Sequence, residues 1–302
     1  MRARLVSVIA VTLITLTACG SPSTEAITIA SADVVATKVY FAESTAAHRV
    51  VALANGSAEI IDAMGLTNIL VGRDIASTEP ALKSVPIVTS GHQVIAEKII
   101  ALHPDLVIID ASVGPQQALD ALRATSIKVV TIKEAWSVEE ISSKVSEVSA
   151  AIGAPRSGAA LAEKLTSIRR IKSEKKSPRM AFLYLRGGNS IYLLGGKGSG
   201  ADSVIEAIGG IDVGSQVSKV AFAPLTAESF AKANPQIILV MTKGLESVGG
   251  VSGLLALPGV AQTDAGKNAR VIAIDDSLLL SFGPRTPSML KKLAAAVSKV
   301  AP

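Results

Sequence analysis

Tyr184 and Arg186 are the pair of residues in this chain whose types and spacing most directly suggest chemistry. They stand two positions apart in a run, residues 180–185, that reads as a strand, so both side chains should point to the same face. A cation beside a phenol favours the phenolate form, and phenolate is one of the axial ligands that proteins offer to haem iron. The pair could therefore bind a metal, although a half-buried Tyr184 with Arg186 in a salt bridge is an equally consistent structural role.

Histidine is scarce, with three residues in the chain. His103 lies before Pro104 in a helix-to-strand turn, and His48 lies at the end of a weakly patterned N-terminal region. His92 follows Gly91 near the end of a predicted short strand at residues 87–88, a position that can face a cleft. A metal ligand and a hydrogen-bonded surface residue are both open for His92. Three histidines and one cysteine argue against a zinc site of the usual His/Cys type.

The single cysteine, Cys19, closes a stretch with the features of a secretory signal. Residues 1–4 carry two arginines, and residues 5–16 form an apolar run too short to span a membrane. The run ends in residues 16–20, Leu-Thr-Ala-Cys-Gly, which resemble a bacterial lipobox. This resemblance implies a signal peptide over residues 1–18, cleavage before Cys19 and lipid on its sulfur. We expect residues 19–47 to be the lipid anchor and a flexible tether, although residues 27–40 could hold a short strand.

Composition limits the other classes of function. The chain has 302 residues, 49% of them hydrophobic, which is enough for two domains with substantial cores. The formal net charge is +5, but no block of Lys and Arg interleaved with aromatic residues indicates a nucleic-acid partner. No Gly-x-Ser-x-Gly nucleophile motif occurs. The glycine-rich loop at residues 195–200 lacks the ending of a phosphate-binding loop and reads as a turn.

Short apolar runs alternate with amphipathic stretches in both halves of the chain. In the first half we expect strands near residues 50–53, 69–72, 106–109 and 129–132, separated by helices. The second half repeats the plan, with strands near 180–185, 237–241 and 271–274. The predicted fold is therefore α/β, with two Rossmann-like lobes built on central parallel sheets, over residues 48–153 and 179–302.

A long helix is predicted between the lobes, over residues 154–178. Leu161, Leu165, Ile168 and Ile171 fall at helical spacing, Pro155 can open the helix and Pro178 stops it. Residues 96–109 also align without gaps on residues 227–240, each as helix, proline turn and buried strand. This repeat favours two lobes of similar fold with a ligand between them.

The order of these segments resembles the cobalamin/siderophore/haem class of ABC-transporter substrate-binding proteins, over about residues 48–301. The resemblance rests on residues 50–66, 70–74, 90–93 and 102–108 in the first half. In the second half, residues 223–229, 257–260, 263–267 and 274–287 are similar to the haem-binding branch. The fold it implies is the class III periplasmic-binding-protein type, with the two lobes joined by a single long helix.

The resemblance also implies roles for particular residues. The haem branch often has tyrosine where His92 stands, but the actinobacterial haem-binding lipoproteins are similar to this chain in pairing a first-lobe histidine with a second-lobe Tyr-x-Arg motif. It therefore implies His92 and Tyr184 as axial ligands of haem iron, supported by Arg186, Arg73 and Arg285. One exposed glutamate per lobe docks on the permease in this class. Glu59 and Glu228 match those positions, with Glu97 as a rival to Glu59 because it repeats Glu228 internally.

The function that follows from the resemblance is capture of haem, as haem b, and its delivery to an ABC permease with its ATPase. The protein would be a monomer, not an enzyme, held by lipid on the extracytoplasmic face of the cell membrane. The alternative within the class is a siderophore or cobalamin binder. An enzyme or cofactor-assembly subunit on the same two-lobed plan is the alternative from another class, but no general-base or nucleophile constellation supports it.

Overall fold

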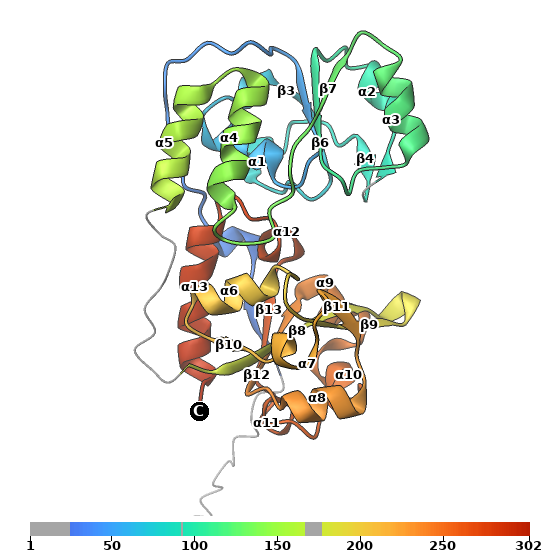
Figure 1. The fold of residues 1–302 in the computed structure, drawn as a ribbon, viewed down its shortest axis with the longest axis vertical. Coiled ribbons are helices and arrows are strands. Elements are labelled where there is room, and N and C mark those ends of the chain that lie inside the picture. The colour runs from blue at the N-terminus through green and yellow to red at the C-terminus, as the bar shows by residue number, and fades with distance from the viewer. Residues whose placement is uncertain (1–24, 92, 167–176) are drawn as a thin grey trace, which may run out of the picture.

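Two separate sheets organise the chain into two lobes (Figure 1). The structure is a computed structural model, and it describes residues 25–91, 93–166 and 177–302. The predicted two-lobed α/β architecture is confirmed. The predicted signal peptide and Cys19 lie outside the described residues, and within the described ranges no helix is long and apolar enough to cross a bilayer.

The first lobe has a four-stranded parallel sheet in the order β3-β2-β6-β7. Its strands are β2 (Val50–Ala52), β3 (Leu70–Arg73), β6 (Leu106–Ile109) and β7 (Lys128–Thr131). Its helices are α1 (Ser57–Ala63), α2 (Ala96–Ile100), α3 (Gln116–Arg123), α4 (Ile141–Ile152) and α5 (Pro155–Thr166). The central strands β2 and β6 are buried along their whole length, as expected of apolar runs covered by helices on both faces. A small antiparallel hairpin, β4 (Thr89–Ser90) and β5 (Gln93–Val94), lies outside this sheet.

The second lobe has a seven-stranded sheet in the order β1-β13-β12-β8-β9-β11, with β10 also paired to β8. Its strands are β1 (Ile27–Ile29), β8 (Arg179–Arg186), β9 (Ile191–Gly195), β10 (Ile211–Asp212), β11 (Phe222–Pro224), β12 (Ile237–Met241) and β13 (Val271–Ile274). Its helices are α6 (Ala201–Ala207), α7 (Gly214–Val217), α8 (Ala227–Ala233), α9 (Thr242–Ser247), α10 (Gly250–Leu255), α11 (Asp264–Lys267), α12 (Asp276–Leu279) and α13 (Thr286–Val300). The sheet is mixed rather than wholly parallel, because β9 runs antiparallel to β8 and β11.

The N-terminal segment is more ordered than a tether. Strand β1 pairs in parallel with β13 at the edge of the second-lobe sheet, so the short strand considered for this region is present. The chain then crosses to the first lobe, where Val39 N–H donates to Ala63 O at 2.8 Å and Ala46 N–H donates to Ile152 O at 2.9 Å. The expectation of a flexible tether to residue 47 is therefore wrong for residues 27–47, and the predicted helix is not the only link between the lobes.

The predicted connecting helix begins at Pro155, as expected, and is described to Thr166 as α5. Over this length it packs side by side with α4 on the first lobe (Figure 1). Gly158 allows the close approach, because a Cβ there would lie 2.0 Å from Ser149 Oγ. Residues 167–176 lie outside the described part of the chain, so the strut predicted to reach Pro178 stays a prediction beyond α5.

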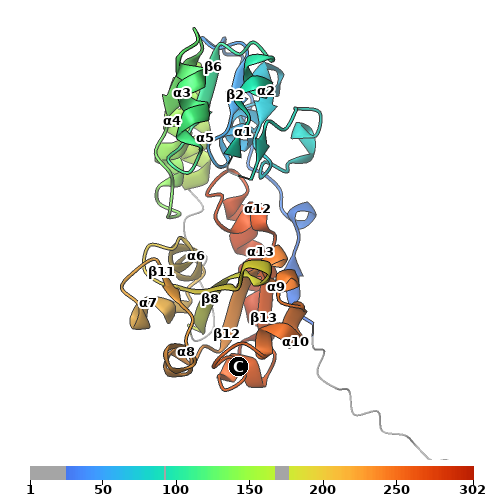
Figure 2. The ribbon, with the colours of Figure 1, turned by 90° about the vertical axis from the view of Figure 1, so that its right-hand side faces the viewer.

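The lobes share part of their core. One cluster of buried side chains runs from Ile60 and Leu106 in the first lobe to Phe182 and Ile272 in the second. Helix α12 and the start of α13 lie at the boundary between the lobes (Figures 1 and 2). The residues between them, 280–285, make several polar contacts with the first lobe that are described below.

Candidate functional site: a cavity between the lobes

A cavity of about 540 Å³ lies between the two lobes. Its walls come largely from residues at or just after the carboxyl ends of strands, where open α/β sheets bind ligands. On the first lobe these include Leu53 and Asn55 after β2, Asp74 after β3 and Asp110 after β6. The second lobe contributes Tyr184, Arg186, Leu193, Phe222, Met241, Asp276 and Leu280. A cavity of this size suits a ligand with a large apolar body and a few polar groups.

Tyr184 and Arg186 line this cavity from the same face of β8, as their spacing predicted. The Arg186 guanidinium carbon lies 4.5 Å from the centroid of the Tyr184 ring, a cation–π contact. Arg186 Nη2 also lies 3.5 Å from Asp276 Oδ1, and Arg186 Nη1 donates to Leu185 O at 2.8 Å. The ring of Phe222 meets Tyr184 edge to face, with centroids 5.8 Å apart. Tyr184 is therefore held from two sides and only half-buried.

The opposite wall of the cavity includes Gly91, at the turn of the β4–β5 hairpin. Gly91 has φ of +60° and nothing within 4 Å of where a Cβ would stand, so the backbone at Gly91 borders open space. His92, the next residue, lies outside the described residues, and its role stays a prediction.

The remaining polar lining of the cavity is tied to its own loops. Asp110 accepts hydrogen bonds from Asn55 N–H at 2.7 Å and from Ser112 N–H at 3.0 Å. Burial raises the pKa of Asp74, whose carboxylate accepts from Ala76 N–H and the Ser77 hydroxyl.

Lys144 is a buried cation in the cavity wall that connects the two lobes. It extends from α4, and its Nζ donates to Ser281 O in the second lobe at 2.7 Å. Burial lowers its pKa to about 8.

Arg73 does not reach the cavity, which corrects its expected role in ligand support. Its guanidinium is buried and donates to the backbone oxygens of Leu82 at 3.0 Å, Val85 at 3.1 Å and Ser77 at 2.9 Å. Arg73 thus fastens the 74–86 loop to the end of β3, a structural role that the sequence motif could not distinguish from ligand binding.

Arg285 and Glu59 also differ from their expected roles. Both are almost fully buried, with 1% and 2% of their surface exposed, and they form a two-bond ion pair across the lobe boundary. Arg285 Nε lies 3.2 Å from Glu79 Oε1, and Nη1 donates to Ser31 Oγ at 2.7 Å. Burial raises the pKa of Glu59 to about 7. Arg285 is therefore an internal anchor, and Glu59 is not available to dock on another protein.

Glu228 and Glu97, by contrast, are exposed in the first turns of α8 and α2. Within the described ranges neither carboxylate takes part in an ion pair. The two helices occupy corresponding places in the predicted internal repeat, which the structure confirms: α2 and β6 lie at the same spacing as α8 and β12. Glu97, unlike Glu59, is therefore exposed, and it occupies the position in the first lobe that corresponds to Glu228 in the second.

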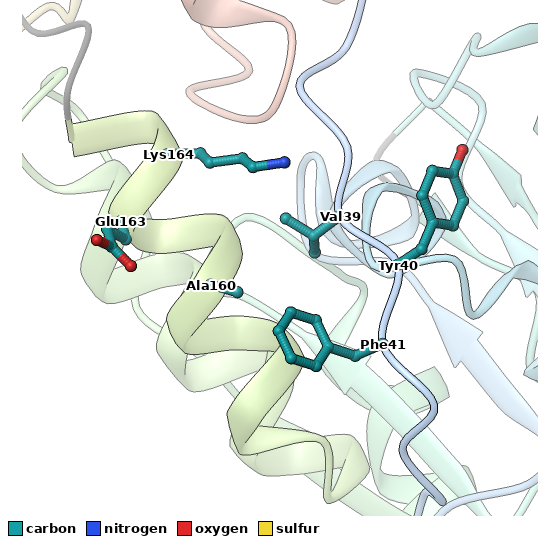
Figure 3. A pocket seen from close by; sticks show the side chains of 6 residues that line it. All are labelled: Val39, Tyr40, Phe41, Ala160, Glu163 and Lys164. Carbon is teal, nitrogen blue, oxygen red and sulfur yellow. The ribbon is translucent and has the colours of Figure 1, made fainter.

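A second hollow, of about 480 Å³, lies on the outer side of the first lobe between residues 39–41 and α5 (Figure 3). Phe41 points toward α5 and Tyr40 points away from it (Figure 3). Lys164 reaches across the hollow, and its Nζ donates to Lys38 O at 3.1 Å. None of the residues predicted to bind a ligand lines this hollow.

Sequence reasoning missed several lining residues of the main cavity. Asp276 is within reach of the strand-end rule, because it lies two residues after the strand 271–274, but that rule gives it no particular role. Trp136 could have been found by extending the same rule beyond the strand 129–132. Phe222 and Lys144 gave no signal, since β11 is only three residues long and Lys144 reads as the polar side of an amphipathic helix.

Comparison with known proteins agrees with this geometry. Residues 50–278 match the model of the family described as periplasmic binding protein. The chain belongs to this family. The periplasmic haem-binding protein RhuT from Roseiflexus sp. RS-1 superposes with a TM-score of 0.77 at 37% identity, covering 84% of this chain and 99% of RhuT. The haem-binding protein HmuT gives 0.77 at 32% identity, covering 93% of this chain and all of HmuT. A lipoprotein of Bacillus subtilis, YvrC, named as an uncharacterized ABC transporter substrate-binding protein, is 26% identical over 82% of this chain and 79% of YvrC.

Solved structures of HmuT variants provide a further comparison with Tyr184 and Arg186. In separate structures, a histidine, a tyrosine, or the arginine two positions after that tyrosine has been replaced by alanine, and all three superpose on this chain with TM-scores of 0.76 to 0.77. The tyrosine and arginine of HmuT have the spacing of Tyr184 and Arg186 in this periplasmic binding protein.

Proposed function

We propose that this protein is an extracytoplasmic haem receptor that holds haem b between its lobes and passes it to an ABC permease. One observation carries the proposal: Tyr184, stacked by Arg186, lies in a large cavity whose opposite wall includes Gly91, the neighbour of His92. The RhuT and HmuT names, and the His, Tyr and Arg variants of HmuT, support the same ligand.

Each lobe would contribute one ligand to the haem iron. Tyr184 would supply phenolate to ferric iron from the second lobe, and His92 a neutral imidazole from the first. Arg186 would hold the Tyr184 ring and can meet a haem propionate, since among the described residues its Nη2 is engaged only by the 3.5 Å ion pair to Asp276. Ligands from both lobes couple haem binding to the arrangement of the lobes, which a permease could recognise.

Delivery would use the exposed glutamates Glu97 and Glu228, one at the start of a corresponding helix in each lobe. Charged groups on the rim of an interface steer and orient the partners. Reversing both charges should therefore abolish uptake of haem while leaving haem binding intact.

The test is growth on haem as the sole iron source, in cells that lack this protein and receive it back as wild type or as Glu97→Lys/Glu228→Lys. The exposed glutamates Glu163 and Glu206, one in each lobe, provide the matched control as Glu163→Lys/Glu206→Lys. Normal growth with the docking variant would refute the roles of Glu97 and Glu228. Normal growth without the protein would refute the proposed function itself.

The proposal includes two lipid chains on Cys19, which hold a protein on a membrane more stably than one. The lipobox-like residues 16–20 support it, as does the lipoprotein name of YvrC. Intact-mass measurement of detergent-extracted protein should show loss of residues 1–18 and two acyl additions, whereas an unmodified Cys19 or a retained Met1 would contradict the anchor. Size-exclusion chromatography should show the proposed monomer.

A further inference from the structure

Three aromatic side chains meet in the cavity between the lobes. The chain has 1 Trp, 3 Tyr and 5 Phe among 302 residues. Trp136, Tyr184 and Phe222 all line this one cavity, with Trp136 on the first lobe and the other two on the second. The only tryptophan therefore belongs to the wall opposite Tyr184 and Phe222.

The Trp136 side chain is exposed yet fixed in place. The residue is 40% exposed, so part of a large apolar ring is open at the cavity. Its backbone N–H donates to Glu140 Oε2 at 2.8 Å, and its indole N–H donates to Glu134 Oε2 at 3.3 Å. The hydrogen bond from the backbone N–H of Trp136 is the main reason that the pKa of Glu140 is lowered. The Glu140 carboxylate therefore stays charged at neutral pH.

The loop that carries Trp136 is fastened to both lobes. Its neighbour Ala135 is buried, and Val138 N–H donates to Ser203 Oγ of α6 in the second lobe at 2.9 Å. A ring that is held by its backbone, its N–H and its loop loses little conformational freedom when a ligand covers it.

We propose that Trp136 is a specificity-determining residue that recognises the flat tetrapyrrole ring itself, independently of the metal at its centre. The inference rests on the proposed function. It assigns two separate tasks to the cavity: Tyr184 and His92 bind iron, and Trp136 packs against the macrocycle. Aromatic stacking contributes beyond buried area and needs no metal. The cavity should therefore also bind protoporphyrin IX that contains no metal.

The experiment measures the Kd of the full mature chain for ferric haem and for metal-free protoporphyrin IX. Trp136→Ala should weaken both by a similar factor, about tenfold, while Trp136→Phe stays within about threefold of wild type. Tyr184→Phe should weaken only ferric haem. Phe41→Ala removes an exposed aromatic ring that lines the other hollow, and it should change neither Kd. Because Trp136 is the only tryptophan, its fluorescence should be quenched in proportion to the bound tetrapyrrole.

The outcomes separate this inference from the proposed function. Unchanged Kd values for Trp136→Ala, with normal wild-type binding, would overturn the role of Trp136 alone. Loss of haem affinity without loss of protoporphyrin affinity would also overturn it, because Trp136 would then act through the iron. A wild type that binds protoporphyrin but not ferric haem would refute the haem receptor, and the Trp136 variants would still be tested with protoporphyrin. A wild type that binds neither refutes both.

Discussion

At the scale of single residues, the contact between Arg186 and Tyr184 is the most informative feature. The guanidinium lies over the ring face, 4.5 Å from its centroid, and is turned toward Asp276 on its other side. Arg186 therefore orients the phenol as well as placing positive charge near it. A planar, delocalised cation is suited to this position, and a lysine is not equivalent.

Replacing Arg186 should disturb the iron site without emptying it. We expect Arg186→Ala to keep haem bound with a shifted absorption spectrum and an affinity about three- to tenfold lower, the size of an exposed to partly buried cation–π contact. Arg186→Lys should recover part of the affinity, since it keeps the charge but loses the stacked plane. An Arg186→Ala protein with wild-type spectrum and affinity would show that the contact has no part in ligation.

Residue-level prediction from sequence succeeded where strand geometry decided the outcome. The two-residue spacing was sufficient to place Tyr184 and Arg186 on one face of β8. It failed for Arg73, Arg285 and Glu59, because membership in a motif does not reveal whether a charged side chain points outward or into the protein. Arg73 folds back onto backbone oxygens of the loop that follows it, whereas Glu59 and Arg285 pair although they lie 226 positions apart in the sequence.

At the scale of elements, the residues between α12 and α13 hold the second lobe to α1 and α4 of the first. Arg285, at the start of α13, pairs with Glu59 of α1, and Lys144 of α4 donates to Ser281 O. Asn55 Nδ2 adds a hydrogen bond to Leu280 O at 3.2 Å. We call these contacts of Arg285, Glu59, Lys144 and Asn55 the polar seam. Because the seam is buried, each polar group relies on its hydrogen-bond partner to replace the water it has lost.

Removing Arg285 should destabilise the whole fold. Arg285→Ala leaves Glu59 and Glu79 without their cation inside the protein, and we expect unfolding free energy to fall by about 3–5 kcal/mol. Urea unfolding followed by circular dichroism measures this. The double variant Arg285→Met/Glu59→Gln should recover much of the loss, because no unpaired charge remains at Glu59. A loss below about 1 kcal/mol, typical of an exposed pair, would contradict the assignment.

Elements that bury a continuous apolar run were predictable, and short edge elements were not. The strands β6 and β12 and the helices before them agree with the repeat read from the sequence. β10 and β11 have two and three residues, and their pairing is set by β8 and β9 rather than by their own pattern. The place of β1 in the second lobe could not be foreseen either, since its partner β13 lies more than 240 residues later.

At the scale of the whole molecule, the buried seam makes stability depend on pH. The pKa of Glu59 is raised from 4.5 to about 7 by burial, so the folded state holds this proton more tightly than the unfolded state. Its contribution to stability is fully present below pH 4.5 and is lost as pH rises through about 7. Burial also raises the pKa values of Asp74, Glu79 and Asp212, which act in the same direction.

Unfolding at pH 5 and at pH 8 tests this dependence. We expect Glu59→Gln to reduce the decline in stability between the two values, by up to about 3 kcal/mol from the size of the shift. Glu206→Gln, at an exposed position of α6, should leave the decline unchanged. If Glu59→Gln and wild type decline equally, Glu59 does not titrate in the seam.

The two-lobed architecture and the place of the cavity followed from alternating strands and helices, since parallel strands present their carboxyl ends at one edge. The sequence did not predict the second crossing between the lobes, over residues 34–49, because those residues carry little periodic pattern. Their position is fixed by the lobes they join.

The absorption spectrum during titration with ferric haem tests the central claim most directly. The wild-type apoprotein should develop a Soret band that saturates, with a phenolate-to-iron charge-transfer band. Tyr184→Phe should lose that charge-transfer band and bind at least tenfold more weakly, and His92→Ala should give a five-coordinate or water-ligated spectrum. Tyr192→Phe, on the neighbouring strand β9, should match wild type. If Tyr184→Phe and His92→Ala both keep the wild-type spectrum and affinity, haem iron is not held between these two residues.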